Sequence, residues 1–271
     1  MRWLALLLEY DGAGFAGSQL QPGRRTVQGT LEEAIEGLTG EQVRAALAGR
    51  TDAGVHALGQ VAAVSIGTMS VASRLDPDAV LRALNHRLPE DVAVRAVADV
   101  EVGFDPRRMA TGRTYRYTIR HGTPRSPLAR SREWLRGGTL DVEAMARAAA
   151  LLPRERRDWA AFAGRVPDGY TTMRTLRRCE VQGAGAHRVV VTMEADAFLP
   201  HQVRLTVGAL ARVGSGRLEP EAFAALVDGA PGSAGPSAPP QGLVLCSVEY
   251  PSGLLRWARG SGNAPSEEGR E

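Results

Sequence analysis

The sequence predicts an α+β protein with two similar lobes. Its 271 residues are enough for one large domain or two smaller ones. The proportions of apolar residues, 44%, and charged residues, 23%, are those of a globular chain. Strand-like and helix-like segments alternate in both halves with a similar rhythm and no detectable sequence repeat. We therefore expect an N-terminal lobe over residues 1–104, a C-terminal lobe over 105–258, and a disordered polar tail over 259–271.

The first half is expected to contain four strands and two helices. The continuous apolar run over residues 3–8 predicts a buried strand. Thr30 and Glu33 have the spacing of a capping box, and apolar residues then recur at helical intervals, which predicts a helix over 27–38. Pro77 favours the first turn of a second helix, which ends at residue 86. The other strands are expected at 42–47, 60–66 and 92–100, and the glycine-rich stretch 49–58 fits neither a helix nor a strand.

The second half repeats this mixture. Strands are expected at residues 115–119, 176–181, 188–193 and 243–248, and helices at 142–152, 201–213 and 220–227. The stretch 229–240 is rich in Gly, Pro, Ser and Ala and is interpreted as a connector.

The charged residues exclude several functions. All 33 basic residues are arginine, which removes lysine Schiff-base chemistry and a Walker lysine. The net charge of +3 and the pI of about 9.2 favour a polyanionic partner. The two cysteines cannot form a zinc cluster by themselves, and the five histidines are scattered, so we expect no metal site. Because no signal peptide or long apolar run is present, we expect a soluble cytoplasmic protein.

A first candidate site lies in residues 49–57, where an acid, a base and a histidine share one loop: Arg50, Asp52 and His56. The small residues beside them allow another molecule to approach the backbone closely. In the ordinary interpretation, Asp52 caps its own loop in an Asx-turn and Arg50 is solvated. The spacing alone leaves both interpretations open.

A second candidate is the arginine-rich segment 107–136. It contains nine arginines against one carboxylate, Glu133, and the aromatic residues Tyr115, Tyr117 and Trp134 lie among them. Such a run is often a solvated face. Interleaved aromatic residues also suit phosphate contacts combined with base stacking, so we favour nucleic-acid binding here.

A third candidate is the segment 198–204, which leads into a helix with an apolar face. Arg204 lies near that face, and a buried arginine would require a carboxylate partner. The alternative is that Arg204 extends to solvent. His201 fits a capping or core histidine better than a metal ligand.

Together these segments resemble the TruA family of tRNA pseudouridine synthases from about residue 4 to residue 251. The matching pieces follow the family order along the chain: Tyr10-Asp11-Gly12, residues 26–32, the highly specific signature Gly49-Arg50-Thr51-Asp52-Ala53-Gly54-Val55-His56-Ala57, residues 113–117, residues 173–176, Phe198-Leu199 with His201, Val203 and Arg204, and Pro239-Pro240 with Gly242, Leu243 and Leu245. Ser18, Pro200, Gln202, Leu205 and Thr206 depart from the family pattern.

The resemblance implies a pseudouridine synthase fold, with two lobes around a mixed, mostly antiparallel sheet and an RNA-binding cleft. It implies isomerisation of uridine to pseudouridine at positions 38, 39 and 40 of the tRNA anticodon stem-loop, without a cofactor. Asp52 is then the nucleophile, Arg204 the cation beside it, and Tyr115 the residue that stacks on the target uracil. Arg50, Leu243, His56 and His201 are expected to bind substrate. The family acts as a homodimer, with one tRNA reaching across both subunits.

Three other functions remain open at this point. One is a pseudouridine synthase with a different RNA target. Another is an RNA-binding or tRNA-folding protein that retains the fold without catalysis, although mere binding does not require a carboxylate among phosphates. The last is a hydrolase that uses Asp52 on a nucleoside, which would require a positioned water and usually a second acid.

Overall fold

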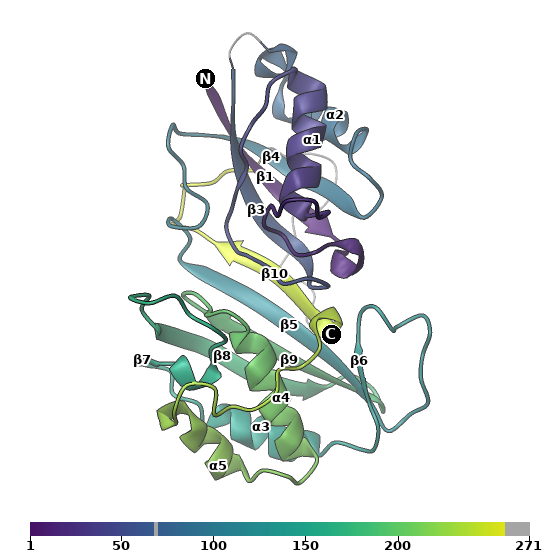
Figure 1. The fold of residues 1–271 in the computed structure, drawn as a ribbon, viewed down its shortest axis with the longest axis vertical. Helices are drawn as coiled ribbons and strands as arrows, with labels where there is room; N and C mark the ends of the chain where they lie inside the picture. The colour runs from purple at the N-terminus through teal and green to yellow at the C-terminus, as the bar shows by residue number, and fades with distance from the viewer. Residues whose placement is uncertain (68–69, 258–271) are drawn as a thin grey trace. The chain divides into compact units, whose positions relative to one another are not determined.

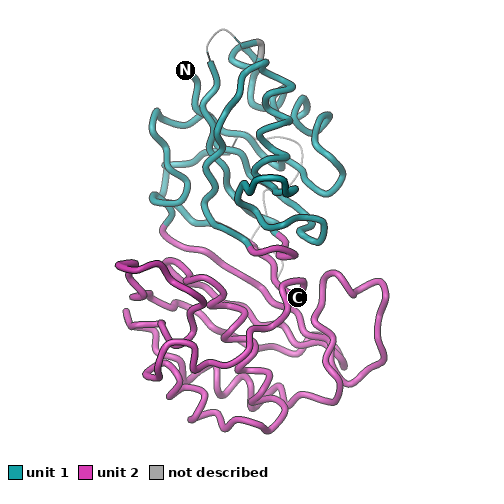
Figure 2. The backbone as a smooth tube through the Cα atoms, in the orientation of Figure 1, with its two compact units in different colours: residues 1–51, 57–110, 248–271 teal, residues 52–56, 111–247 magenta. Residues whose placement is uncertain are grey.

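The computed structural model describes residues 1–67 and 70–257. The predicted tail lies outside these residues. The chain divides into two compact units (Figure 2): unit 1 comprises residues 1–51, 57–110 and the chain from residue 248 onward, and unit 2 comprises residues 52–56 and 111–247. The predicted lobes, 1–104 and 105–258, differ from this division, whose main boundary falls after residue 110. The segment that begins with Asp52 groups with unit 2, and the C-terminal segment groups with unit 1.

Unit 1 is built on an antiparallel sheet (Figure 1). The strands β1 (Arg2–Tyr10), β3 (His56–Ile66) and β4 (Val92–Val100) are arranged in the order β4-β1-β3, and the short strand β2 (Ala46–Leu47) pairs with β3. The helices α1 (Val27–Thr39) and α2 (Pro77–Asn85) pack together, and α2 packs on β4. Because side chains alternate along a strand, each strand contributes to two apolar layers.

The layer that contains Ala5, Ala63 and Ala98 is buried with Phe104. Partly buried residues of the C-terminal segment pack against this cluster, among them Tyr250 and Trp257. Tyr250 also donates a hydrogen bond of 2.7 Å to the carbonyl oxygen of Pro106. Residues 248–257 therefore pack on the core of unit 1 although they are distant in sequence from the rest of that unit.

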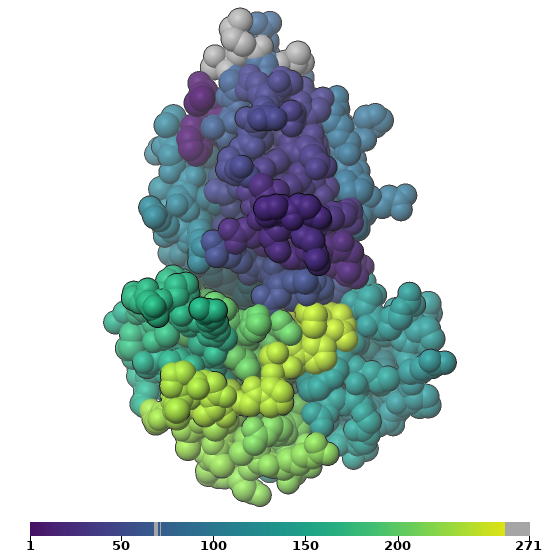
Figure 3. Space-filling view, in the orientation of Figure 1, coloured from purple at the N-terminus to yellow at the C-terminus, as the bar shows by residue number. Residues whose placement is uncertain are grey.

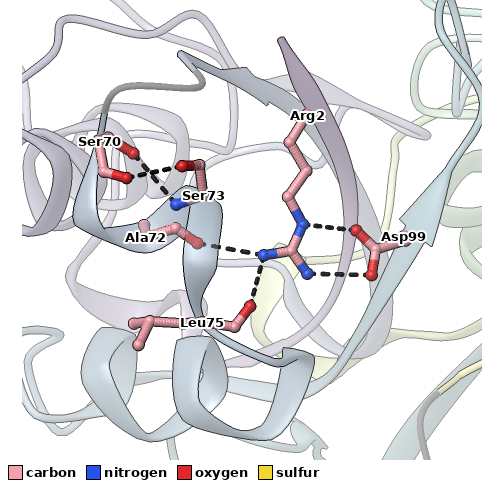
Figure 4. A network of polar contacts seen from close by, with 6 residues as sticks. All are labelled: Arg2, Ser70, Ala72, Ser73, Leu75 and Asp99. Carbon is pink, nitrogen blue, oxygen red and sulfur yellow. Dashed lines mark hydrogen bonds and ion pairs between the residues drawn. The ribbon is translucent and has the colours of Figure 1, made fainter.

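Arg2 ties the edge of unit 1 together (Figure 4). Its Nε and Nη2 donate to the two carboxylate oxygens of Asp99, at 2.5 and 2.9 Å, and its Nη1 donates to the carbonyls of Ala72 and Leu75. Ala72 belongs to the 3₁₀ turn η2 (Val71–Arg74), whose N-cap is Ser70. One guanidinium thus fixes β1 against β4 and against the turn that leads into α2.

The remaining strands of the sheet and three α-helices follow in unit 2 (Figure 1). The strands β5 (Gly112–His121), β7 (Arg156–Asp158), β8 (Met173–Gly183), β9 (Arg188–Ala195) and β10 (Leu243–Glu249) are arranged in the order β10-β5-β9-β8-β7. The pairs β5·β9, β8·β9 and β7·β8 are antiparallel, whereas β6 (Trp134–Arg136) pairs with β5 in parallel. The expected α+β class with a mixed, mostly antiparallel sheet is confirmed.

The helices α3 (Val142–Ala150), α4 (Gln202–Gly214) and α5 (Pro220–Ala225) pack against one another, and α3 packs on β8. Trp159, Phe162 and Phe223 are fully buried in this layer. Within the described part of the chain, no helix is both long enough and apolar enough to cross a membrane.

Most predicted elements are confirmed, with several corrections. The cap of α1 is Thr26, whose side chain accepts a hydrogen bond from the amide of Gly29, and the predicted cap Thr30 lies inside the helix. The predicted strand 42–47 shrinks to β2, and β3 begins at His56 within the stretch interpreted as loop. The last predicted helix ends at Ala225 and continues as the 3₁₀ turn η4 (Leu226–Asp228). The strands β6 and β7 were not predicted, because three residues carry too little periodicity.

Candidate active site

The loop that carries the signature motif is anchored in unit 1 by a buried polar network. The hydroxyl of Tyr10 lies 2.8 Å from Oγ1 of Thr51, and the hydroxyl of Ser18 accepts a hydrogen bond of 2.8 Å from the amide of Thr51. Gln60 is fully buried and bonds both the amide and the carbonyl of Gly49. Burial raises the pKa of Tyr10, so its phenol is neutral and serves as a hydrogen-bonding group.

Sequence reasoning missed this anchor. Ser18 was noted only as a departure from the family pattern, but it is completely buried and bonds Thr51 at both its amide and its hydroxyl. A small hydroxyl residue at this position lets the backbone at Thr51 approach closely. The only signal in the sequence was the departure itself.

Asp52 forms an ion pair with Arg204. Nη1 of Arg204 lies 2.6 Å from Oδ2 of Asp52, and the two residues are 152 positions apart in the chain. The Arg204 side chain is 13% exposed and that of Asp52 is 36% exposed. Nε of Arg204 also donates to the carbonyl of Ala238 at 2.8 Å, which fixes the plane of the guanidinium. The interpretation in which Arg204 extends to solvent is therefore wrong.

The Asp52 carboxylate does not cap its own loop within the described residues. Its side-chain neighbours are Arg204 and His201, whose Nε2 lies 3.5 Å from Oδ2. Both contacts involve Oδ2, so Oδ1 has no partner among the described residues. The Asp52 side chain is 36% exposed, and the hydrogen bond from Arg204 engages only one of its two oxygens.

The turn into α4 places His201 beside Asp52. His201 is the N-cap of the helix and has a φ of 60°, and it is the only non-glycine residue with positive φ among the described residues. Such backbone strain is concentrated at functional sites. The departures from the family pattern stabilise this turn: Oε1 of Gln202 accepts the amide of Leu199, and Thr206 donates to the carbonyl of Gln202.

The imidazole ring of His201 packs on Gly164. A Cβ atom at Gly164 would lie 3.2 Å from Nδ1 of His201 and 3.3 Å from the carbonyl oxygen of Pro200. Gly164 also donates its amide to that carbonyl at 2.8 Å. Gly164, which follows the 3₁₀ turn η3 (Ala160–Phe162), therefore packs against the strained turn and is hydrogen-bonded to it.

Two tyrosines of β5 lie on the same buried face. Tyr115 is 8% exposed and contacts Phe198 edge to face, with ring centroids 5.2 Å apart. Phe198 lies three residues before His201, so one short segment carries both a contact of Tyr115 and a neighbour of Asp52. Tyr117 is fully buried and donates a hydrogen bond of 2.7 Å to the carbonyl of Pro239. Burial raises the pKa of Tyr117, and the nearby charge of Arg204 opposes this shift.

The segment that leads into β10 joins these groups. The carbonyl of Ala238 holds Arg204 and that of Pro239 holds Tyr117, and the next turn is η5 (Pro240–Gly242). Gly242 has no room for a side chain, because a Cβ atom there would lie 2.6 Å from the Tyr117 ring. Leu243 follows and is 6% exposed.

The remaining predicted site residues are placed differently. His56 is 2% exposed, and its Nε2 donates a hydrogen bond of 2.7 Å to the carbonyl of Ser131. Its ring thus holds the loop to the segment between β5 and β6. Arg50 is exposed and directly precedes the anchored Thr51.

The arginine-rich segment does not form one uniform solvated face. Arg113 is buried and donates to the carbonyl of Asp196, and Arg120 pairs with Glu133 at 2.6 Å. Glu133 also pairs with Arg188 at 2.8 Å. Most of the other arginines are exposed: Arg107, Arg108, Arg116, Arg125, Arg130 and Arg132. Among the residues the structure describes, no three His, Cys, Asp or Glu side chains gather as a metal site.

The fold is α+β, and the site brings one carboxylate, that of Asp52, against one guanidinium, that of Arg204. Comparison with known proteins identifies the family. A sequence model described as tRNA pseudouridine synthase matches residues 7–107 and 156–251. The chain belongs to this family of isomerases that act on tRNA.

Curated relatives cover almost the whole chain. A protein of Geobacter sulfurreducens named tRNA pseudouridine synthase A is 44% identical over 252 residues, which is 92% of this chain and 100% of the relative. Proteins of the same name from Chloroflexus aurantiacus and Myxococcus xanthus are 43% and 42% identical, over 96% and 98% of this chain and 93% and 99% of the relatives.

Proposed function

We propose that this protein converts uridine to pseudouridine at positions 38, 39 and 40 of the tRNA anticodon stem-loop, with Asp52 as the nucleophile. The bond between N1 of uracil and C1′ of ribose breaks, the base turns, and a bond forms between C5 and C1′. The proton that leaves C5 is matched by the proton gained at N1. No atom is gained or lost overall, and the reaction involves no net oxidation.

The observation that carries this proposal is the ion pair between Asp52 and Arg204. A nucleophilic carboxylate must be ionised, and a guanidinium 2.6 Å away stabilises its charge and fixes its direction. Because Arg204 and His201 approach Oδ2, we assign the attack to Oδ1. Whether this oxygen attacks C1′ or the base, it must reach a uridine that has left its stack, which costs about a few kcal/mol.

We assign Tyr115 to stacking on the target uracil and to relaying the C5 proton through its hydroxyl. The edge contact with Phe198 fixes the plane of the ring. Leu243 is assigned to the apolar wall of the uracil pocket, and Arg50 to holding the extruded nucleotide. His201, whose side chain is 46% exposed, remains available for substrate contact. The buried His56 is assigned to positioning the loop through Ser131.

We further propose that the protein acts in the cytoplasm as a homodimer, with one tRNA reaching across both subunits. These statements rest on the family resemblance. Exposed arginines of the segment 107–136 are assigned to phosphate contacts.

The test is tritium release from tRNA that carries 5-³H-uridine, with wild type and Asp52→Ala compared at equal protein concentration. Release by the wild type alone supports isomerisation by Asp52. Loss of the signal when uridines 38, 39 and 40 are replaced by cytidine supports the assigned positions. Release by both proteins contradicts Asp52 as nucleophile, and tight tRNA binding without release by either favours a binding protein or another RNA substrate.

A further inference from the structure

A cavity of about 360 Å³ lies between the β5–β6 loop and the strands that flank it. Its lining includes Arg120, Arg125, Arg130, Glu133, Trp134 and Gln241. This volume lies within the range of small-ligand sites. All of these residues belong to unit 2, and the loop projects beyond the edge of the sheet (Figure 1). The segment that carries Gln241 runs across the face of unit 2 (Figure 3).

The cavity has more positive charge than its own carboxylate can neutralise. Glu133 is 12% exposed and is already shared between Arg120 and Arg188, at 2.6 and 2.8 Å. Arg125 has no hydrogen bond or ion pair with the described residues. The guanidinium of Arg130 bonds only the carbonyl of Pro127, at 3.0 Å. Two exposed guanidinium groups therefore lack an anion, and phosphate is an anion that their planar fork can bind with two hydrogen bonds.

The same cavity contains an aromatic surface. Trp134 is partly buried, contacts Tyr117 edge to face at 6.2 Å, and has the guanidinium of Arg136 at 5.1 Å from its ring. Burial lowers the pKa of Arg136, and the charge of Arg217 lowers it further. An indole beside arginines is the combination that binds single-stranded nucleotides by stacking and by phosphate contact. The amide of Gln241 adds a donor and an acceptor for the edge of a base.

Two connections join this cavity to the loop of Asp52. The carbonyl of Ser131, in the β5–β6 loop, accepts the hydrogen bond of His56. Gln241 directly follows Pro240, which packs on Gly54: a Cβ atom at Gly54 would lie 3.1 Å from Cγ of Pro240. Two sequence neighbours of the lining residues, Ser131 and Pro240, therefore contact residues that follow Asp52.

We propose that this cavity binds a second unpaired nucleotide of the RNA substrate, adjacent in sequence to the target uridine. Trp134 stacks on its base, and Arg125 and Arg130 bind its phosphate. The proposal rests on the function proposed above, in that it takes RNA as the substrate. It adds a specificity site separate from Asp52, Tyr115 and Arg204.

The first test measures binding of an anticodon stem-loop in the Asp52→Ala background, so that turnover does not interfere. We expect Trp134→Ala, and the double variant Arg125→Ala with Arg130→Ala, each to raise the Kd about tenfold. Arg147→Ala is a control for the loss of one positive charge, because it removes an exposed arginine of the same unit from α3. Trp134→Phe keeps a stacking ring and is expected to restore most of the affinity.

The second test uses a stem-loop that is abasic at the nucleotide before or after the target. We expect one of these RNAs to bind wild type about tenfold more weakly, and Trp134→Ala to show no further loss with it. Equal affinity of all variants for the intact stem-loop would overturn the subsite, and so would independent losses for Trp134→Ala and the abasic RNA. Absence of tritium release by the wild type, with these binding effects intact, would overturn the isomerase function and leave the subsite standing.

Discussion

At the scale of single residues, the pairing of Asp52 with Arg204 shows how far sequence patterns reach. The position of Arg204 near an apolar helix face predicted that, if buried, it would require a carboxylate partner. That partner lies 152 residues away, and no pattern in the sequence selects one of the 30 acidic residues. The family resemblance named the pair, and the geometry supplies the detail that Oδ2 is the oxygen engaged. The burial of Ser18 against Thr51 could not be predicted in the same way, because serine residues are mostly exposed.

The pair predicts that Arg204→Lys lowers kcat far more than it changes KM. Lysine keeps the charge, but it loses the fork that bonds Asp52 and the carbonyl of Ala238 together. We expect kcat to fall about 10²-fold, the scale of removing one preorganised electrostatic contact. Arg212→Lys makes the same change two turns later on α4 and is expected to leave kcat unaltered. Steady-state tritium release over a range of tRNA concentrations gives kcat and KM for both variants, and an unchanged kcat in Arg204→Lys would show that the fork is dispensable.

Tyr115 supports a separate prediction about proton transfer. Tyr115→Phe keeps the ring and its edge contact with Phe198, so KM is expected to be unchanged. If the hydroxyl relays the C5 proton, kcat falls about 10²-fold, as for loss of a general acid–base group. Tyr117→Phe is the control: it removes the bond to Pro239 and is expected to cost about 1 kcal/mol of stability. Full turnover by Tyr115→Phe would eliminate the relay.

At the scale of elements, long periodic segments were predictable and short ones were not. The helix α1 and the strand β4 match their predicted ranges to within a residue, because each has enough residues for a full apolar stripe. The strands β6 and β7 have three residues each, and their pairing partners, not their own pattern, make them strands. The start of α4 was predicted one residue early, at His201, because sequence does not reveal a left-handed N-cap.

The packing of α4 predicts the effect of a substitution at Gly208, a glycine inside this helix. A Cβ atom at Gly208 would lie 2.3 Å from the carbonyl oxygen of Pro236, and backbone cannot yield as a side chain does. We expect Gly208→Ala to destabilise the fold by about 1–3 kcal/mol despite the better helix propensity of alanine. The shift would also disturb Ala238, and so lower kcat through Arg204.

Gly37 of α1 provides the matched control for this substitution. It is exposed, and a Cβ atom there would meet only the side chain of Arg87, at 3.7 Å. Gly37→Ala is therefore expected to stabilise the protein by about 0.5–1 kcal/mol. Thermal unfolding midpoints compare the two variants. Opposite expectations for one chemical change make the pair informative: a rise in midpoint for Gly208→Ala would refute the close approach of α4 to the segment 236–238.

At the scale of the whole molecule, the two units share the chain in a way that sequence could not specify. Composition and rhythm predicted two α+β lobes, yet the assignment of residues 52–56 to unit 2 and of the C-terminal segment to unit 1 depends on long-range contacts. The consequence for function is that the anchor of the signature loop and its carboxylate belong to different units. Ser18 and Thr51 lie in unit 1, and Asp52 pairs within unit 2.

The charge of the whole molecule leads to a prediction about salt. All 33 basic residues are arginine, and the exposed arginines of the segment 107–136 include several without a carboxylate partner, such as Arg125. If these groups bind phosphates, they displace counterions that are bound to the RNA, so log Kd for tRNA rises linearly with log salt concentration.

About six such contacts would weaken binding roughly 10³-fold between 50 and 200 mM salt. Removing Arg125 and Arg130 together is expected to lower the slope by about two, whereas Arg147→Ala leaves it unchanged. Fluorescence anisotropy of labelled tRNA over this salt range measures the slopes. An affinity that does not vary with salt would contradict phosphate binding by the segment, because arginines that contact the backbone cannot avoid displacing its counterions.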